Sequence, residues 1–223
     1  MSFLLHIDSA VQTASVCLSK DGKTLALKIN PLQTDHASWL QPAIQALLEE
    51  NNVSINNIDA LSVSSGPGSY TGLRVGMATA KGLCYTLNKP LILINTLQMM
   101  AVSALNESCT LICPMIDARR MEVFTAIFNH SLHAVVPSHN FILSENSFVD
   151  LLEKERIIFF GNGSEKFRSM TSHPNAIFKH LETTAEQMVG LSYQSFLNKD
   201  FANLAYCEPL YGKEFFSPAV GKK

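Results

Sequence analysis

Hydrophobic and polar residues alternate through much of the first 30 residues, as they do in half-buried β-strands. Three apolar runs stand out. The first ends at Asp8, and Asp21-Gly22, a strong signal for a two-residue turn, separates the second from the third. From His36 to Asn51 the apolar residues recur at spacings of three and four, which is typical of an amphipathic helix. The pattern therefore predicts a three-stranded antiparallel meander followed by a helix.

The same succession of strands and helices is predicted twice along the chain. The first copy has strands at 3–7, 13–19, 24–29, 58–63 and 91–94 and helices at 36–51, 72–87 and 96–105. The second copy has strands at 111–116, 122–128, 133–141, 157–160 and 176–178, a short helix after residue 163, and helices at 144–153 and 184–198. In each copy an unbroken apolar run follows the meander, which is typical of a parallel strand covered on both faces.

Two short motifs recur at the same step of each copy. Residues 7–10, Ile-Asp-Ser-Ala, correspond to 116–119, Ile-Asp-Ala-Arg, and the glycine loop at 66–69 corresponds to the one at 161–164. Because matches this short also arise by chance, the shared order of elements carries more weight than the identities. Together they indicate an internal duplication.

Two copies of a meander followed by helix-crossed parallel strands describe the duplicated ribonuclease-H-like α/β fold, also called the actin-like ATPase or ASKHA fold. We predict a first subdomain at 1–106, a second, shorter one at 107–216 and a C-terminal tail at 217–223. In this fold the Asp turns and glycine loops face a nucleotide cleft between the subdomains. The candidates for that cleft, which we expect to be vestigial, are Asp8, Gly66, Gly68, Asp117, Gly161 and Gly163.

The first glycine loop joins a strand to a helix, and the N–H groups at a helix N-terminus can hold an anion. The known phosphate-binding fingerprints nevertheless do not match. Leu73-Arg74 follows Gly72 where a P-loop requires Lys-Ser or Lys-Thr, and the spacing of the glycines is one residue too long for GxGxxG. A turn that only sets the direction of the helix is an equally good interpretation.

Composition narrows the class of protein. With 47% hydrophobic and 16% charged residues the chain is globular. Its net charge of −2 disfavours independent binding to nucleic acid, and a local basic patch is left open. Its five cysteines are odd in number and lack C-x-x-C spacing, which argues against a disulfide framework and a zinc ribbon. We expect a cytoplasmic protein without a signal peptide or a membrane-spanning helix.

Four segments carry a resemblance to a known family, the bacterial TsaB (YeaZ) proteins. They are Ile7-Asp8, the loop and helix from Gly66 to Gly82, Ile116 to Arg119 with Glu122-Val123, and Glu208-Pro209-Leu210-Tyr211. The resemblance implies a non-catalytic subunit in the synthesis of threonylcarbamoyladenosine (t6A) in tRNA. It further implies a TsaD-type catalytic subunit and a TsaE-type ATPase as partners, contact with tRNA only through the complex, and a possible homodimer when the chain is alone. No firmly bound cofactor is expected, and ATP or ADP at the partner interface is left open.

The family's catalytic paralogue, TsaD, holds a metal with two histidines on an H-x-x-x-H helix. In this sequence His36 occupies the first place, but Leu40 stands four residues later. One imidazole cannot make such a site, so we expect neither a metal nor catalysis here.

The resemblance also implies that the first two helices form the partner interface. Gly72, Gly76 and Ala80 recur at intervals of four on the second helix, and this strip of small residues would let another helix approach closely. Internal packing of the strip on the domain's own sheet is the equal alternative. The complete set of predicted interface residues is His36, Trp39, Leu40, Leu47, Gly72, Gly76 and Ala80.

A stand-alone actin-like ATPase, kinase or peptidase is the alternative function. Its support is the pair Asp8 and Asp117 beside the two glycine loops. Against it, Ala10 stands where phosphotransferases of this fold carry the glycine of Asp-x-Gly, so the phosphate turn is degraded. Arg119-Arg120, in the second hairpin turn, could contact a phosphate or a partner and could equally be solvated.

Overall fold

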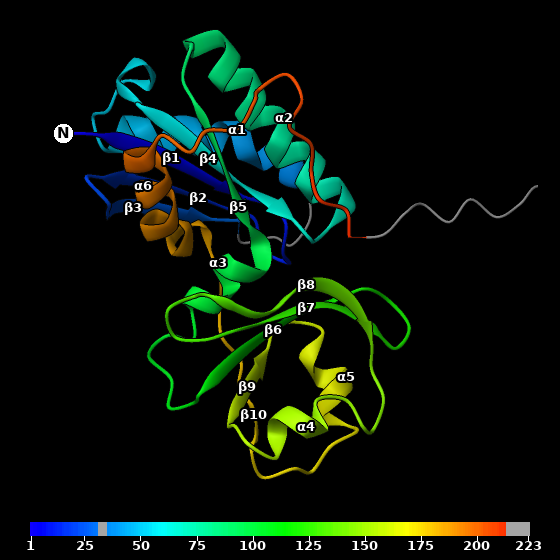
Figure 1. Cartoon of the computed structure of the whole chain (residues 1–223). Helices are drawn as coiled ribbons and strands as arrows, with labels where there is room; N and C mark the ends of the chain where they lie inside the picture. The colour runs from blue at the N-terminus through cyan, green and yellow to red at the C-terminus, as the bar shows by residue number, and fades with distance from the viewer. Residues whose placement is uncertain (31–34, 213–223) are drawn as a thin grey trace, which may run out of the picture.

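The computed structural model describes residues 1–30 and 35–212, and it consists of two subdomains, each built on a five-stranded sheet (Figure 1). The first sheet has the order β3-β2-β1-β4-β5, and the second has the order β10-β9-β6-β7-β8. The strands of the first sheet are β1 (Phe3–Asp8), β2 (Ser15–Lys20), β3 (Lys23–Ile29), β4 (Ala60–Gly66) and β5 (Leu91–Asn95). Those of the second are β6 (Leu111–Asp117), β7 (Glu122–Phe128), β8 (Ala134–Ile142), β9 (Ile157–Phe160) and β10 (Ala176–Phe178).

The two sheets have the same topology. When β6 to β10 are matched with β1 to β5, both the strand order and the directions agree. In each sheet the first three strands form the antiparallel meander, and the last two run parallel to the first strand. The duplicated actin-like fold predicted from the order of elements is therefore confirmed.

Six α-helices and two 3₁₀ helices are present in the described ranges. They are α1 (His36–Glu50), η1 (Ile55–Asn57), α2 (Tyr70–Leu87), α3 (Thr96–Val102), α4 (Val149–Leu152), α5 (Ser164–Arg168), η2 (Ala185–Gln187) and α6 (Met188–Asn198). The predicted helix at 144–153 is reduced to the single turn of α4. Phe148 just before it has a left-handed backbone, and the Ser147 hydroxyl accepts from the Ser144 N–H at 2.8 Å, so these residues form a turn instead. No described helix is both long and apolar enough to cross a bilayer.

Neighbouring residues of β1 point to opposite faces of the first sheet, and helices cover both faces. Leu5 packs with the apolar sides of α1 and α2, whereas Leu4 packs with α3, η2 and α6. One core therefore lies on each side of the sheet. This arrangement fixes the N-terminus of α2 at the carboxyl end of β4, where the first glycine loop lies.

The second subdomain ends earlier in the sequence than we predicted. We placed 107–216 in it, but α6 packs on the first sheet, where Met188 shares a core with Leu4 and Ile92 (Figure 1). Farther along, the Ala202 N–H donates to the Leu91 carbonyl at 2.8 Å. The chain thus returns to the first subdomain, because the apolar side of α6 fills a face of the first sheet that α3 covers only in part. The predicted tail at 217–223 lies outside the described residues.

Candidate functional site

A cleft with a volume of about 1180 Å³ lies between the subdomains. Each subdomain contributes its Asp turn and its glycine loop to the wall, at 10–13 and 68–71 from the first and at 117–119 and 161–162 from the second. The linker segment 179–184 closes another side. The duplication therefore brings together the motifs that recur in the sequence.

The first turn is closed by hydrogen bonds within the chain. The N–H of Ala10 donates to Asp8 Oδ1 at 3.0 Å, and the Ala10 carbonyl accepts from the N–H of Ser69 at 2.7 Å. A Cβ at Gly68 would collide with the same carbonyl, so this glycine permits the close approach. Two amides that could bind a phosphate are already used, and the turn does not fit the phosphates of a nucleotide.

Asp8 itself lies behind the cleft wall. Its side chain is fully buried, and Oδ2 has no hydrogen-bond partner among the described residues, as is also true of the neighbouring Ser64 hydroxyl. Burial raises the pKa of Asp8 to about 6, while the Ala10 N–H, which donates to Oδ1, acts in the opposite direction. A carboxyl in this position cannot reach a ligand in the cleft.

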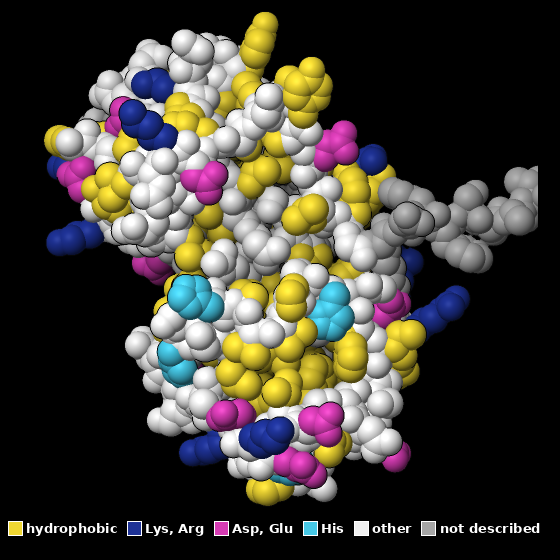
Figure 2. All heavy atoms as spheres, in the orientation of Figure 1, with side chains coloured by type: hydrophobic (Ala, Val, Ile, Leu, Met, Phe, Trp, Pro, Cys, Tyr) yellow, Lys and Arg dark blue, Asp and Glu magenta, His cyan; other side chains and the backbone are white. Residues whose placement is uncertain are grey.

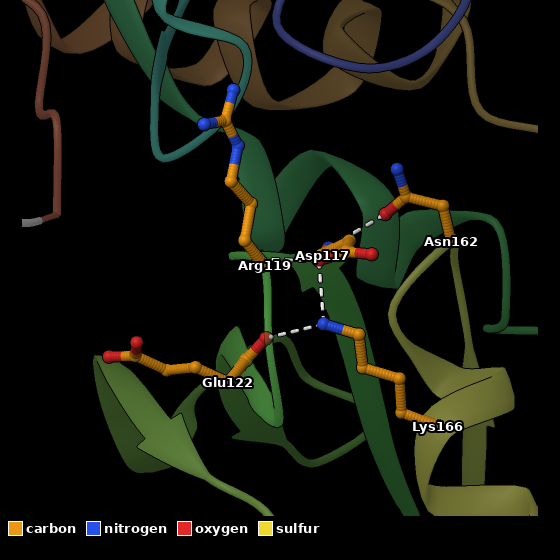
Figure 3. Close-up of polar contacts among 5 residues, drawn as sticks. All are labelled: Asp117, Arg119, Glu122, Asn162 and Lys166. Carbon is orange, nitrogen blue, oxygen red and sulfur yellow. Dashed lines mark hydrogen bonds and ion pairs between the residues drawn. The ribbon is translucent and has the colours of Figure 1, made fainter.

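The second turn is held by a different network (Figure 3). Lys166 Nζ lies 2.6 Å from Asp117 Oδ1 and also donates to the Glu122 carbonyl at 3.0 Å. The same oxygen of Asp117 accepts from the Arg119 N–H at 2.6 Å, and the Asp117 N–H donates to Asn162 Oδ1 at 2.9 Å. Partial burial favours a higher pKa for Asp117, but Lys166 and the Arg119 N–H outweigh it and hold the pKa below its usual value.

Arg119 and Arg120 both have left-handed backbones, with φ of 68° and 52°. Residues other than glycine rarely adopt a positive φ, so the backbone of this turn is strained. The Arg119 side chain extends away from Asp117 toward the first subdomain (Figure 3) and lines the cleft. It is therefore a cationic group on the cleft wall.

The six predicted cleft residues divide into two groups. Gly68, Asp117 and Gly161 line the cavity. Asp8, Gly66 and Gly163 do not: Gly66 faces the Leu210 carbonyl near the C-terminus, and Gly163 faces β6 and β7. Within the described chain no group of three His, Cys, Asp or Glu side chains is arranged to hold a metal ion.

Five of the seven predicted interface residues face inward, and their assignment to the partner interface is wrong. Leu40, Leu47 and Ala80 are buried in the core between the helices and the first sheet. A Cβ at Gly72 would meet the Ser9 carbonyl, and one at Gly76 would meet the Ser9 hydroxyl. The strip of small residues thus seats α2 on its own sheet, which is the alternative stated above. His36 and Trp39 are half-buried and remain predicted contacts.

The opposite side of α2 is exposed and carries small residues too. Ala78 and Gly82 face solvent, and a Cβ at Gly82 would meet nothing within 4 Å. Tyr85, one turn later, is 83% exposed, and Figure 2 shows hydrophobic side chains standing out over the upper part of α2. The sequence contained a signal for this face, because the bulky residues Leu73 and Met77 mark the inner side of the same helix.

The sequence analysis missed the role of residues 199–212, which we call the C-terminal strap. This segment runs along α2, where its Cys207 carbonyl accepts from Lys81 Nζ at 3.0 Å. At its end the Tyr211 hydroxyl accepts from Arg74 Nε at 3.0 Å, and the Arg74 guanidinium lies 4.1 Å from the centre of the Tyr70 ring. The weak Glu-Pro-Leu-Tyr motif at 208–211 is therefore a docking segment.

Two sheets of identical topology, with paired Asp turns and glycine loops on a shared cleft, define a protein of the duplicated actin-like class whose first phosphate turn is closed. The sequence matches the family described as TsaD, tRNA N6-adenosine threonylcarbamoyltransferase, over residues 30–195. The chain therefore belongs to this family, and two relatives of which it covers 87% and 93% are named TsaB.

Two such relatives are named tRNA threonylcarbamoyladenosine biosynthesis protein TsaB. The one from Bacillus subtilis is 29% identical over 202 residues, which cover 88% of this chain and 87% of the relative. The one from Escherichia coli is 26% identical over 219 residues, covering 93% of each. The solved structure of YeaZ from Pseudomonas aeruginosa superposes with a TM-score of 0.81 at 24% identity, over 95% of this chain and all of that one, and supports the fold.

Proposed function

We propose that this chain is a non-catalytic subunit that pairs with a TsaD-type subunit to make t6A in tRNA. The names of its relatives support a role in this modification. The non-catalytic role is supported by the residue that stands at the second metal-binding position. Leu40, where the second metal-binding histidine would stand, is fully buried in the core. His36 therefore has no imidazole partner four residues later, which supports a non-catalytic role.

The exposed side of α2 is the proposed contact surface. Ala78 and Gly82 leave room for a helix to approach closely, and Tyr85 beside them offers a large aromatic side chain, a residue type enriched at interface hot spots. This surface replaces the inward-facing strip chosen from the sequence. A TsaD-type partner would place its own helices against it, and the TsaE-type ATPase and the tRNA would join the pair in the assembled complex.

Substitution of Gly82 tests the contact surface with a matched control. Gly82→Leu adds bulk to the proposed contact, whereas Gly190→Leu adds the same bulk to α6, where a Cβ would also meet nothing within 4 Å. Neither change should unfold the chain, because leucine favours a helix more than glycine does. We expect Gly82→Leu to weaken binding to the TsaD-type subunit by about 10-fold or more in isothermal titration calorimetry. Equal affinity of both variants would exclude this surface.

Reconstitution tests the function itself. The TsaD-type subunit, the TsaE-type ATPase, tRNA and threonylcarbamoyl-adenylate should give t6A only when this chain is added. The Gly82→Leu chain should restore less product, and the Gly190→Leu chain should restore as much as the unsubstituted one. Full t6A synthesis without this chain would overturn the proposal. Adding ATP or ADP during the titration would test whether a nucleotide lies at the interface.

The alternative of a stand-alone ATPase, kinase or peptidase has less support. Asp8 lies behind the cleft wall, and the N–H groups of Ala10 and Ser69 are already hydrogen-bonded. A hydrolysis assay on the purified chain, repeated with Asp8→Ala, separates the two functions. Activity that the substitution abolishes would count against a purely non-catalytic role. We also propose that the protein acts in the cytoplasm, where tRNA is modified.

A further inference from the structure

The C-terminal strap reaches both subdomains at its end. On one side the Tyr211 ring lies 5.0 Å from the Tyr70 ring at the start of α2. On the other side Gly212 lies against Phe124 of β7, so close that a Cβ would come within 2.5 Å of the ring. Gly212 also has a φ of 69°, which favours glycine. Two adjacent residues of the strap thus contact opposite walls of the cleft.

The strap also fixes the first glycine loop from behind. The Leu210 N–H donates to the Ser65 carbonyl at 2.7 Å, one residue before the loop begins. Gly66 has a φ of 109°, and a Cβ at this residue would collide with the Leu210 carbonyl. The loop and the strap therefore hold each other in place through backbone contacts.

The covalent connections between the subdomains lie on the other side of the molecule. The chain leaves the first subdomain after α3 and returns to it through 179–184, and these two crossings touch where the hydroxyls of Ser103 and Thr183 lie 3.2 Å apart. In Figure 1 α3 lies on the left of the interface between the subdomains and the end of the strap lies on the right. The two adjacent crossings leave the opposite side of the interface without a covalent connection, and the end of the strap spans that side.

We propose that the C-terminal strap is a latch, which holds the cleft at its present width and keeps the first glycine loop closed. The contacts of its end, residues 210–212, include the hydrogen bond from Arg74 to Tyr211, the tilted contact between the Tyr211 and Tyr70 rings, the backbone hydrogen bond from Leu210 to Ser65 and the packing of Gly212 on Phe124. Each of these is individually modest, so the latch can open without unfolding either sheet. The proposal does not depend on the proposed function.

Hydrogen exchange on the full chain tests the latch. The double variant Tyr211→Ala, Gly212→Val removes the ring contacts and forces a Cβ against Phe124. The matched control is Tyr206→Ala, which removes an 83% exposed ring from the same strap. We expect the double variant to speed exchange of the Ser69 N–H, which is bonded to Ala10, by about 10-fold or more. The control should not change it.

Small-angle scattering is the second measurement. In the hydrogen-exchange experiment, the amides of β2 and β7 report whether both sheets stay folded. In the double variant the radius of gyration should rise while exchange in both sheets stays unchanged. A chain ended after Cys207 keeps Leu204 and Cys207 in the core and should behave like the double variant, whereas a chain ended after Gly212 should behave like the full chain. Unchanged exchange at Ser69 and an unchanged radius of gyration in the double variant would overturn the proposal. So would an equal effect of Tyr206→Ala.

Discussion

At the scale of single residues, His6 shows how the first sheet uses a buried polar side chain. Its ring is fully buried in β1 and lies 2.7 Å from the hydroxyls of both Ser19 in β2 and Ser62 in β4. The imidazole thus joins three neighbouring strands. Burial lowers its pKa from 6.5 to about 3, so the ring stays neutral in the folded chain.

This shift predicts a loss of stability in acid. Between pH 6.5 and 3 the unfolded chain binds a proton at His6 that the folded chain does not, so the free energy of unfolding falls as the pH falls. Between pH 7 and 5 the loss from this group is about 2 kcal/mol. Urea titrations of the chain and of His6→Gln at both pH values measure it. The substituted chain should lose about 2 kcal/mol less, and parallel behaviour would contradict the shift.

Asp8 has the opposite linkage. Its pKa is raised from 3.8 to about 6, so between these pH values the folded chain holds a proton at Asp8 that the unfolded chain has lost. The contribution of Asp8 to the free energy of unfolding is therefore lost as the pH rises through 6. Asp8→Asn keeps an acceptor for the Ala10 N–H and removes the buried charge. We expect the variant to be more stable by roughly 2 to 3 kcal/mol at pH 7.5 and no more stable at pH 3.5. A stabilisation that is equal at both pH values would contradict a titrating Asp8.

At the scale of elements, α2 shows that the two faces of one helix carry glycines for opposite reasons. Gly76 faces the first sheet, where a Cβ would meet the Ser9 hydroxyl, whereas Gly82 faces open space. Gly76→Ala should therefore destabilise the chain by about 1 to 3 kcal/mol, and Gly82→Ala should stabilise it by about 0.5 to 1 kcal/mol. Thermal unfolding of the two variants compares them directly. Shifts of the same sign would mean that the two glycines lie in similar surroundings.

The same helix shows what sequence periodicity can predict. The spacing of Leu73, Met77, Ala80 and Cys84 correctly predicts a helix here, just as alternation predicts the strands of both meanders. A strip of small residues has no hydrophobic label of its own, but Ala80 belongs both to the strip and to the apolar side that Leu73 and Met77 mark, so the periodicity already favoured an inward strip. The turn at 144–148 was missed because it depends on a serine hydroxyl and a left-handed Phe148, which leave no periodic signal.

At the scale of the whole molecule, the order of elements predicted the duplication, and the paired motifs predicted which loops meet at the cleft. What the sequence did not predict is which surface each later segment covers. The helix α6 was correctly predicted as a helix but was assigned to the wrong subdomain. Met188 on its apolar side packs with Leu4 and Ile92 of the first sheet, and the spacing of its apolar residues does not specify that choice. The same holds for the C-terminal strap, whose docking depends on α2 rather than on a pattern of its own.

The return of the chain makes the first subdomain discontinuous, which predicts what will fold alone. Residues 1–106 lack α6, so Leu4 and Ile92 would lose part of their cover, and we expect this fragment to aggregate. A chain that joins residue 103 to residue 183 should fold, because the hydroxyls of Ser103 and Thr183 are 3.2 Å apart and about four Gly/Ser residues would span the junction. Both fragments should carry Leu97→Gln and Met100→Gln, since these side chains pack on the second sheet. We expect dispersed amide resonances and cooperative unfolding for the joined chain and neither for the 1–106 fragment. A folded 1–106 fragment would show that α6 and the strap are dispensable.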